Sequence, residues 1–145
     1  MKKLLMCLLM LLTYTATICA QSLNDYKYVV IQHQEDSKKD IELRMTKEFP
    51  LLGFVLLTEE EASQLEDKQK SLLLTAEYLC RQSVQCFFRL KLKNSKGEIV
   101  YEDEQVAAAG FMSYKNDRQS AIKKIFKQLK KQNYQFIPTE MKIVE

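Results

Sequence analysis

The residue types that most often carry out catalysis are sparse in this sequence. His33 is its single histidine, so a histidine-rich zinc site cannot be built. Cys80 and Cys86 are separated by five residues, which differs from the C-x-x-C spacing of thioredoxin-type redox motifs. His33 could serve as a base for either thiol. Nothing in the sequence places them together, however, and we expect a satisfied or solvent-facing histidine just beyond a strand. We therefore expect no metal site and no cofactor.

Carboxylates gather in two places, Glu59–Glu61 and Glu102–Glu104. Paired carboxylates can serve glycoside hydrolysis or calcium binding. The first group, however, suits the start of a helix, where acidic side chains offset the helix dipole, and the second suits a strand with cations opposite. The chain also lacks a G-x-S-x-G nucleophile elbow and a glycine-rich phosphate loop. We therefore predict a protein that is not an enzyme, with an enzyme of unrecognised type as an alternative.

The two cysteines have two interpretations that the sequence leaves open. In an oxidising compartment Cys80 and Cys86 can form a disulfide, if a turn between strands brings their Cα atoms within about 4.4 to 6.8 Å. Alternatively, both are small buried hydrophobic residues, because a bridge across so short a loop removes little chain entropy.

The chain begins with the pattern of a secretory signal peptide, residues 1–20. The Lys2–Lys3 pair forms its positive region and Leu4–Leu12 its apolar region. A bacterial lipoprotein would be cut just before Cys19, but that cleavage needs a small residue where this chain has Ile18. We therefore expect cleavage after Ala20, no lipid anchor, and a mature protein in the periplasm or outside the cell.

The mature chain, residues 21–145, has 125 residues with 20 basic and 19 acidic side chains, a net charge of +1. This length suits a single globular domain. A near-neutral chain lacks the broad positive field with which nucleic-acid binders attract phosphate, so we expect no nucleic-acid partner. No later stretch is apolar over the ~20 residues that cross a bilayer, so we expect no transmembrane segment after signal cleavage.

The first part of the mature chain predicts a strand followed by a helix. Tyr26–Gln32 is rich in β-branched and aromatic residues, as strands are. Ser37 and Asp40 fit a capping box, and apolar residues at four-residue spacing predict a helix that Pro50 limits, after which Gly53 supplies a stop. The apolar residues of that helix are Ile41, Met45 and Phe49.

Three shorter elements follow. Phe54–Leu57 has the short apolar run of a buried strand. Thr58 and Glu61 form a second capping box, which predicts a helix that continues to about Asp67. Ser71–Leu79 predicts another strand.

The stretch Val84–Val106 predicts a β-hairpin, because apolar and polar residues alternate on both sides of a turn at Asn94–Gly97. Oppositely charged side chains then face each other on the solvent side and support the register. The expected pairs are Leu92 with Ile99, Leu90 with Tyr101, Lys93 with Glu98, and Arg89 with Glu102.

Asp117–Gln132 predicts a helix with one apolar stripe, which must cover the sheet. The stripe consists of Ala121, Ile122, Ile125, Phe126 and Leu129. Five lysines lie largely off this stripe: Lys123, Lys124, Lys127, Lys130 and Lys131. The tail, residues 133–145, is expected to be an edge strand or to dock loosely.

The expected elements follow the order β-α-β-α-β-β-β-α. This order predicts an α/β (α+β) two-layer sandwich, in which a mixed sheet of about four to five strands has helices on one face. The architecture hosts many functions, so the fold alone does not assign one.

Four stretches carry a resemblance: Ser22–Val30, Leu52–Phe54, the turn Lys93–Glu98, and Asn133–Tyr134 after the last helix. With the signal peptide before them, they resemble a group of small uncharacterised secreted proteins of Gram-negative bacteria. The resemblance spans nearly the whole mature chain and implies an exported β-α-β domain completed by ββα. Its motifs are structural and transfer no active site. The layout is also similar to the amino-terminal domain of TolB-like envelope proteins, in fold only.

Two classes of binding function remain open. The first is a non-catalytic interaction domain that recognises an unknown protein or envelope component through its sheet face, edge strand or loops. Its candidate contact is Ala107–Met112, where Phe111 and Met112 could touch a partner, although strand ends of this kind commonly pack inward. The second is peripheral binding of anionic lipid or lipopolysaccharide through the five lysines of the last helix. Against it, solvated lysine faces are common on soluble helices.

Overall fold

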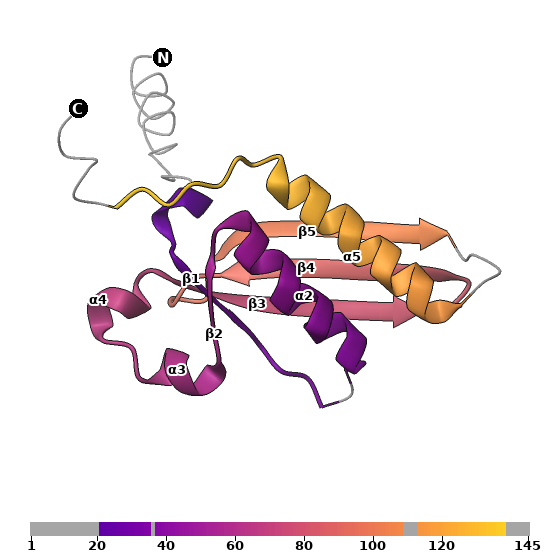
Figure 1. Ribbon diagram of the computed structural model, residues 1–145, viewed down its shortest axis with the longest axis horizontal. Helices are drawn as coiled ribbons and strands as arrows, with labels where there is room; N and C mark the ends of the chain where they lie inside the picture. The colour runs from indigo at the N-terminus through magenta and orange to yellow at the C-terminus, as the bar shows by residue number, and fades with distance from the viewer. Residues whose placement is uncertain (1–20, 36, 109–112, 139–145) are drawn as a thin grey trace, which may run out of the picture.

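A five-stranded mixed sheet forms the centre of the molecule (Figure 1). The computed structural model describes residues 21–35, 37–108 and 113–138, so the expected signal peptide lies outside the described residues. The strand order is β2-β1-β3-β4-β5, with β1 parallel to both of its neighbours and the other pairs antiparallel. The strands are β1 (Tyr28–Ile31), β2 (Val55–Leu57), β3 (Leu73–Gln82), β4 (Gln85–Lys93) and β5 (Ile99–Ala108).

Two long helices, α2 (Lys39–Leu52) and α5 (Tyr114–Lys130), lie side by side across one face of this sheet (Figure 1). The shorter elements are the 3-10 turn η1 (Leu23–Asp25) and the helices α3 (Glu59–Ser63) and α4 (Asp67–Lys70). The expected α/β (α+β) class with a mixed sheet is confirmed. Among the described residues, no helix combines the length and the apolar character that crossing a bilayer requires.

The core lies between the two long helices and the sheet, because strand alternation and the helix stripes present apolar side chains to the same layer. Its fully buried side chains include Val29, Leu74, Phe88, Leu90, Leu92, Met45, Phe49, Ile122, Ile125 and Leu129. The Phe49 ring packs edge-on against Phe126, with centroids 5.0 Å apart. The apolar stripes expected on both helices are therefore the surfaces that cover the sheet.

Helix α2 begins one residue later than the capping box predicts, and it runs through Pro50 to the expected stop at Gly53. Its N-cap is Lys38, whose ammonium group has no acceptor and makes no capping bond. The Ser37 hydroxyl, the expected cap, instead accepts a hydrogen bond from the Tyr78 hydroxyl. Pro50 lies inside the helix, which continues to Leu52. The proline removes one backbone donor in the last turn, and the helix ends where Gly53 adopts a left-handed φ of 102°.

The helix expected to run to Asp67 is instead two short helices. The Thr58 capping box is present, with the Thr58 backbone N–H donating to Glu61 at 2.8 Å. The helix ends at Ser63, and a second start follows, where the Glu66 backbone N–H donates to the Gln69 side chain at 3.2 Å. A second local cap thus divides the segment.

The hairpin between β4 and β5 forms with a different register from the expected one. Leu92 pairs with Tyr101 and Arg89 with Glu104, two residues beyond Ile99 and Glu102. The turn accounts for one residue of this shift, because the Asn94 backbone N–H donates to the Glu98 carbonyl at 2.9 Å. An irregularity between Leu92 and Lys93 accounts for the other. A shift of two preserves which side chains face the core.

The described part of the tail, residues 133–138, docks without forming a strand. The Tyr134 ring stacks on Phe54 with centroids 3.8 Å apart, and its hydroxyl donates to the Tyr26 carbonyl at 2.7 Å. The Ile137 N–H donates to the Asn24 carbonyl at 2.9 Å. The tail therefore joins the end of α5 to the segment that contains η1 and Tyr26.

Candidate functional site

Helix α5 starts at Tyr114, three residues earlier than expected, because Ser113 caps it by accepting the Asn116 N–H at 3.2 Å. The whole expected stripe from Ala121 to Leu129 is buried against the sheet. This packing fixes the rotation of the helix about its axis. Side chains between the stripe positions must then face solvent.

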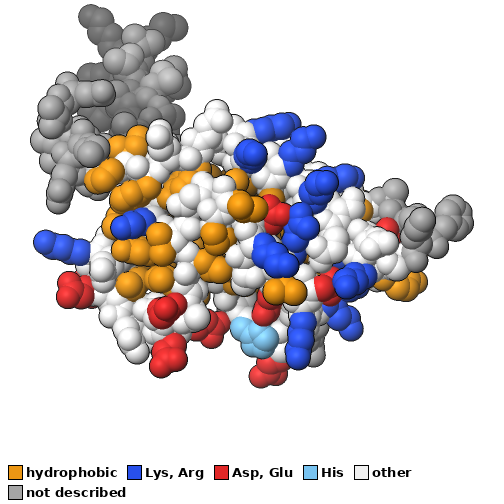
Figure 2. Space-filling view, in the orientation of Figure 1, with side chains coloured by type: hydrophobic (Ala, Val, Ile, Leu, Met, Phe, Trp, Pro, Cys, Tyr) orange, Lys and Arg blue, Asp and Glu red, His pale blue; other side chains and the backbone are white. Residues whose placement is uncertain are grey.

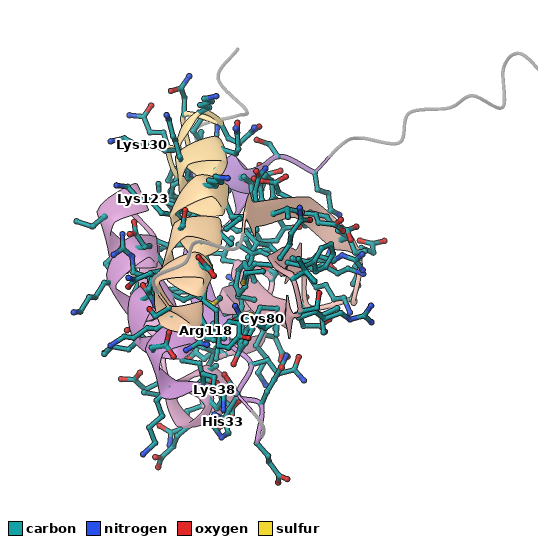
Figure 3. The ribbon with its side chains drawn as sticks, turned by 90° about the vertical axis from the view of Figure 1, so that its right-hand side faces the viewer. His33, Lys38, Cys80, Arg118, Lys123 and Lys130 are labelled. Atoms are coloured by element: carbon teal, nitrogen blue, oxygen red, sulfur yellow. The ribbon has the colours of Figure 1, made fainter. Side chains whose placement is uncertain are left out.

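Four exposed lysines form what we call the lysine ridge: Lys123, Lys127, Lys130 and Lys131. Lys127 lies four residues after Lys123, and Lys130 and Lys131 lie three and four residues after Lys127, so the four share one side of α5 and the turn that follows it. Figure 3 shows Lys123 and Lys130 on the side of the helix that faces away from the sheet. Figure 2 shows Lys and Arg side chains gathered along this face of the molecule.

The charges of the ridge are unpaired in the part of the chain that the structure describes. None of its four ammonium groups forms an ion pair there. Helix α5 carries six basic side chains and one acidic one, Asp117, which is buried. The fifth expected lysine, Lys124, is also exposed, but its Nζ donates to the Val106 carbonyl at 2.9 Å and so holds the helix against β5.

A partly buried ion pair, which we call the clamp, holds the N-terminal parts of α2 and α5 together. Arg118 donates to both carboxylate oxygens of Asp40, at 2.9 and 3.4 Å, and Gln119 donates to Asp40 at 3.1 Å. Burial by itself raises the pKa of Asp40, but the hydrogen bonds from Arg118 and Gln119 outweigh it and hold the pKa below its ordinary value of 3.8. The clamp therefore contains a carboxylate that stays ionised, and it orients α5.

The cysteines that the sequence singled out lie close together on β3 and β4. Their Sγ atoms are 3.9 Å apart, and both are free thiols. Burial raises the pKa of the Cys80 thiol to about 12 and also raises that of Cys86. Because the thiolate is the nucleophile, these thiols are poorly suited to nucleophilic catalysis.

The His33 ring contacts a carboxylate and neither of the two thiols. Its Nδ1 is 3.1 Å from the Glu42 carboxylate, and its side chain is 64% exposed. Glu42 also accepts a hydrogen bond from the Tyr78 hydroxyl at 2.7 Å. Burial raises the pKa of Tyr78, so this hydroxyl stays protonated as a donor. The network ties the loop after β1 to α2 and β3, and no sequence motif pointed to it.

The acidic groups serve the roles expected of them. Glu61 caps α3, and Glu59 accepts the His33 backbone N–H at 3.0 Å. Glu102 and Glu104 pair with cations on β4. Within the described ranges, no group of three or more His, Cys, Asp or Glu side chains could hold a metal ion.

A shallow groove of about 340 Å³ crosses the sheet beside the end of β1. It is lined by Gln32, Gln34, Glu77, Tyr78, Leu79, Arg89 and Lys91. Its charged members already have partners: Glu77 pairs with Lys93 at 2.6 Å, Arg89 with Glu104 at 2.8 Å, and Lys91 with Glu102 at 3.5 Å. The groove thus presents neutralised charges, unlike the ridge.

The other contact that the sequence predicts for a partner is formed by Phe111 and Met112. Both lie outside the described residues. Ala107, the start of that segment, is buried with 3% of its surface exposed, as expected for a strand end that packs inward.

No protein-family model matches the chain. No curated protein matches it either. Among solved structures, the chain has a distant likeness to two PelC dodecamers from Paraburkholderia phytofirmans, one of them a point variant. The variant is 15% identical, with a TM-score of 0.48 over 77% of this chain and 91% of that one. The other is 14% identical, with a TM-score of 0.48 over 81% and 92%. Likeness at this level carries no function to this chain.

Proposed function

We propose that this protein is an exported, non-catalytic binding domain whose lysine ridge docks on an anionic surface of the cell envelope. The ligand chemistry is phosphate carried by an amphiphile, either an anionic phospholipid headgroup or lipopolysaccharide. The protein lies on such a surface as a peripheral component.

The observation that supports this proposal is the unpaired charge of the ridge. Four ammonium groups share one side of α5 and have no carboxylate partner among the described residues, whereas the cations of β4 all have one. A lysine near an anionic membrane surface contributes about 1 kcal/mol of attraction. Four lysines together therefore supply up to roughly 4 kcal/mol, which corresponds to a weak and reversible affinity of about 1 mM.

The way in which α5 is held also supports a binding surface. The stripe on its other side is fully used by the core, and the Asp40–Arg118 clamp fixes its first turn. The ridge is therefore presented on a rigid element, and binding requires little ordering of the backbone.

Sedimentation of the exported protein with vesicles tests the proposal. The vesicles are phosphatidylcholine alone, phosphatidylcholine with phosphatidylglycerol, and phosphatidylcholine with lipopolysaccharide. We expect binding to both anionic mixtures at low salt and its loss in 0.5 M salt, where the Debye length is below about 5 Å. Binding to the lipopolysaccharide mixture alone would identify that source of phosphate. Equal binding to neutral vesicles, or no binding to anionic ones, would overturn the proposal. If the protein instead captured an envelope protein in a way that resists salt, a protein partner would be favoured.

A further inference from the structure

Cys80 and Cys86 are placed for a reaction that neither the binding proposal nor the fold requires. We infer that they form an intramolecular disulfide when the protein meets an external disulfide such as oxidised glutathione. Their Sγ atoms are in van der Waals contact at 3.9 Å. Both residues lie on the core face of adjacent antiparallel strands, where Cys80 pairs with Phe88 and Cys86 with Gln82.

The connection between the two strands favours closure. β3 ends at Gln82 and β4 starts at Gln85, with the Ser83 N–H donating to the Gln85 carbonyl at 3.1 Å. The two cysteines are thus diagonal neighbours beside a tight turn, within the reach of cross-strand side-chain contacts. A disulfide needs the sulfur atoms to approach to about 2.05 Å, which rotation of the two side chains and a small movement of the turn can supply.

The environment of the pair favours exchange within the pair over reaction with other molecules. Cys86 is fully buried and Cys80 is half-buried, so Cys80 is the sulfur that an external disulfide can reach. The raised pKa of each thiol keeps the thiolate fraction small at neutral pH, which makes the first attack slow. An exported protein has the oxidising compartment in which such a pair persists as a disulfide.

The reaction is a two-step thiol–disulfide exchange. The Cys80 thiolate attacks one sulfur of oxidised glutathione, forming a mixed disulfide and releasing one glutathione thiolate, which takes up a proton. The Cys86 thiolate then attacks Cys80 Sγ and releases the second glutathione. Two protein thiols are oxidised and one glutathione disulfide is reduced to two thiols, so atoms and electrons balance.

Peptide mapping tests this inference, because Arg81 lies between the cysteines. The exported protein is incubated with oxidised glutathione, free thiols are blocked with iodoacetamide in denaturant, and the chain is cut with trypsin without reduction. Trypsin cuts after Lys70, Arg81 and Arg89, which places the two cysteines on different peptides. We expect most of the protein to give Ser71–Arg81 linked to Gln82–Arg89, about 2 mass units lighter than the two peptides together. Reduction should separate them.

Two variants control the experiment. Neither Cys80→Ser nor Cys86→Ser should give the linked pair, and Cys86→Ser, which lacks the second thiol, should keep glutathione bound to Cys80. Oxidised glutathione should raise the melting temperature of the parent protein. Recovery of both peptides in the alkylated form after oxidation would overturn the inference. So would a stable glutathione adduct on Cys80 of the parent protein, in which Cys86 is present to displace it, or a disulfide between two chains. None of these outcomes depends on lipid binding.

Discussion

The two charged surfaces of this molecule use their cations in opposite ways. On the outer face of the sheet, three cations of β4 are each paired with a carboxylate of a neighbouring strand: Arg89, Lys91 and Lys93. Their shortest nitrogen–oxygen distances are 2.6 to 3.5 Å. On α5, the four lysines of the ridge have no such partner among the described residues. The near-zero net charge of residues 21–145 therefore conceals one neutralised surface and one cationic surface.

The difference between paired and unpaired cations indicates which of the two surfaces can attract an anionic ligand. Paired charges on adjacent strands support the register and contribute little attraction for a ligand, because the field of each cation is cancelled nearby. Unpaired charges on a rigid helix contribute nothing to register and keep their field available to an anion. The stability of the fold should therefore respond to the buried side of α5, and binding should respond to its exposed side.

The largest effect on stability should come from the buried side of α5. Phe126→Ala removes a ring packed edge-on against Phe49 and should lower the free energy of unfolding by about 3 to 5 kcal/mol. Phe87→Ala on the outer face of the sheet should cost far less, because that ring is only partly buried. Urea unfolding followed by circular dichroism measures both. Similar losses would mean that α5 is not the main cover of the core.

The clamp at the start of α5 should have the next largest effect. Arg118→Ala leaves a partly buried Asp40 without its bidentate partner and should cost about 2 kcal/mol. The matched control is Arg44→Ala, which breaks an i,i+4 pair with Glu48 within α2 whose arginine is more exposed than Arg118, and it should cost about 0.5 kcal/mol. The same urea experiment compares them, and equal costs would show that the clamp does not position the helix.

Acid should weaken the same clamp. The pKa of Asp40 is lower in the folded protein than in the unfolded chain, so Asp40 binds its proton more readily when unfolded. Its contribution to stability is complete above the unfolded pKa and is lost as the pH falls through the folded pKa. Between about pH 5 and about pH 2, stability should fall less steeply in Asp40→Asn than in the parent. Parallel curves from urea unfolding at each pH would contradict this.

The smallest effect on the free energy of unfolding should come from the paired charges on the outer face of the sheet. A double-mutant cycle with Arg89→Ala and Glu104→Ala should give a coupling energy of about 0.2 to 1 kcal/mol. Sedimentation of these variants with anionic vesicles should match that of the parent. Weaker vesicle binding by Arg89→Ala would place part of the binding surface on the sheet and would remove the contrast between the two surfaces.

Local patterns predicted most of the fold. The stripe on α5 and the alternation in β4 depend on residues close in sequence, so the sequence alone indicated both elements and their buried sides. The hairpin register depends on how Asn94 closes the turn and on an irregularity beside Leu92, and neither has a clear sequence signal. The predicted start of α2 was wrong for a related reason. The Ser37 hydroxyl contacts Tyr78, which is distant in the chain.

The candidate site was predicted in part. The positions of the ridge lysines off the apolar stripe follow from helical spacing. Whether a basic side chain of α5 has a partner depends on its tertiary neighbours, which the sequence does not reveal. Lys124 donates to the Val106 backbone carbonyl, and Arg118 pairs with the Asp40 carboxylate. The closeness of Cys80 and Cys86 likewise became clear only from the pairing of β3 with β4.

The most direct test of the account compares two variants that lose the same charge at different places. The ridge variant carries Lys123→Gln, Lys127→Gln, Lys130→Gln and Lys131→Gln. The control carries Lys38→Gln, Lys39→Gln, Lys68→Gln and Lys70→Gln, which are exposed lysines outside the ridge.

The affinity of each variant for phosphatidylglycerol vesicles is measured at low salt and in 0.5 M salt. At low salt the ridge variant should bind at least about a hundredfold more weakly than the parent, and the control less than about tenfold more weakly. At high salt the three proteins should differ little. Equal losses in the two variants at low salt would show that net charge, and not the ridge, governs binding, and would contradict the account.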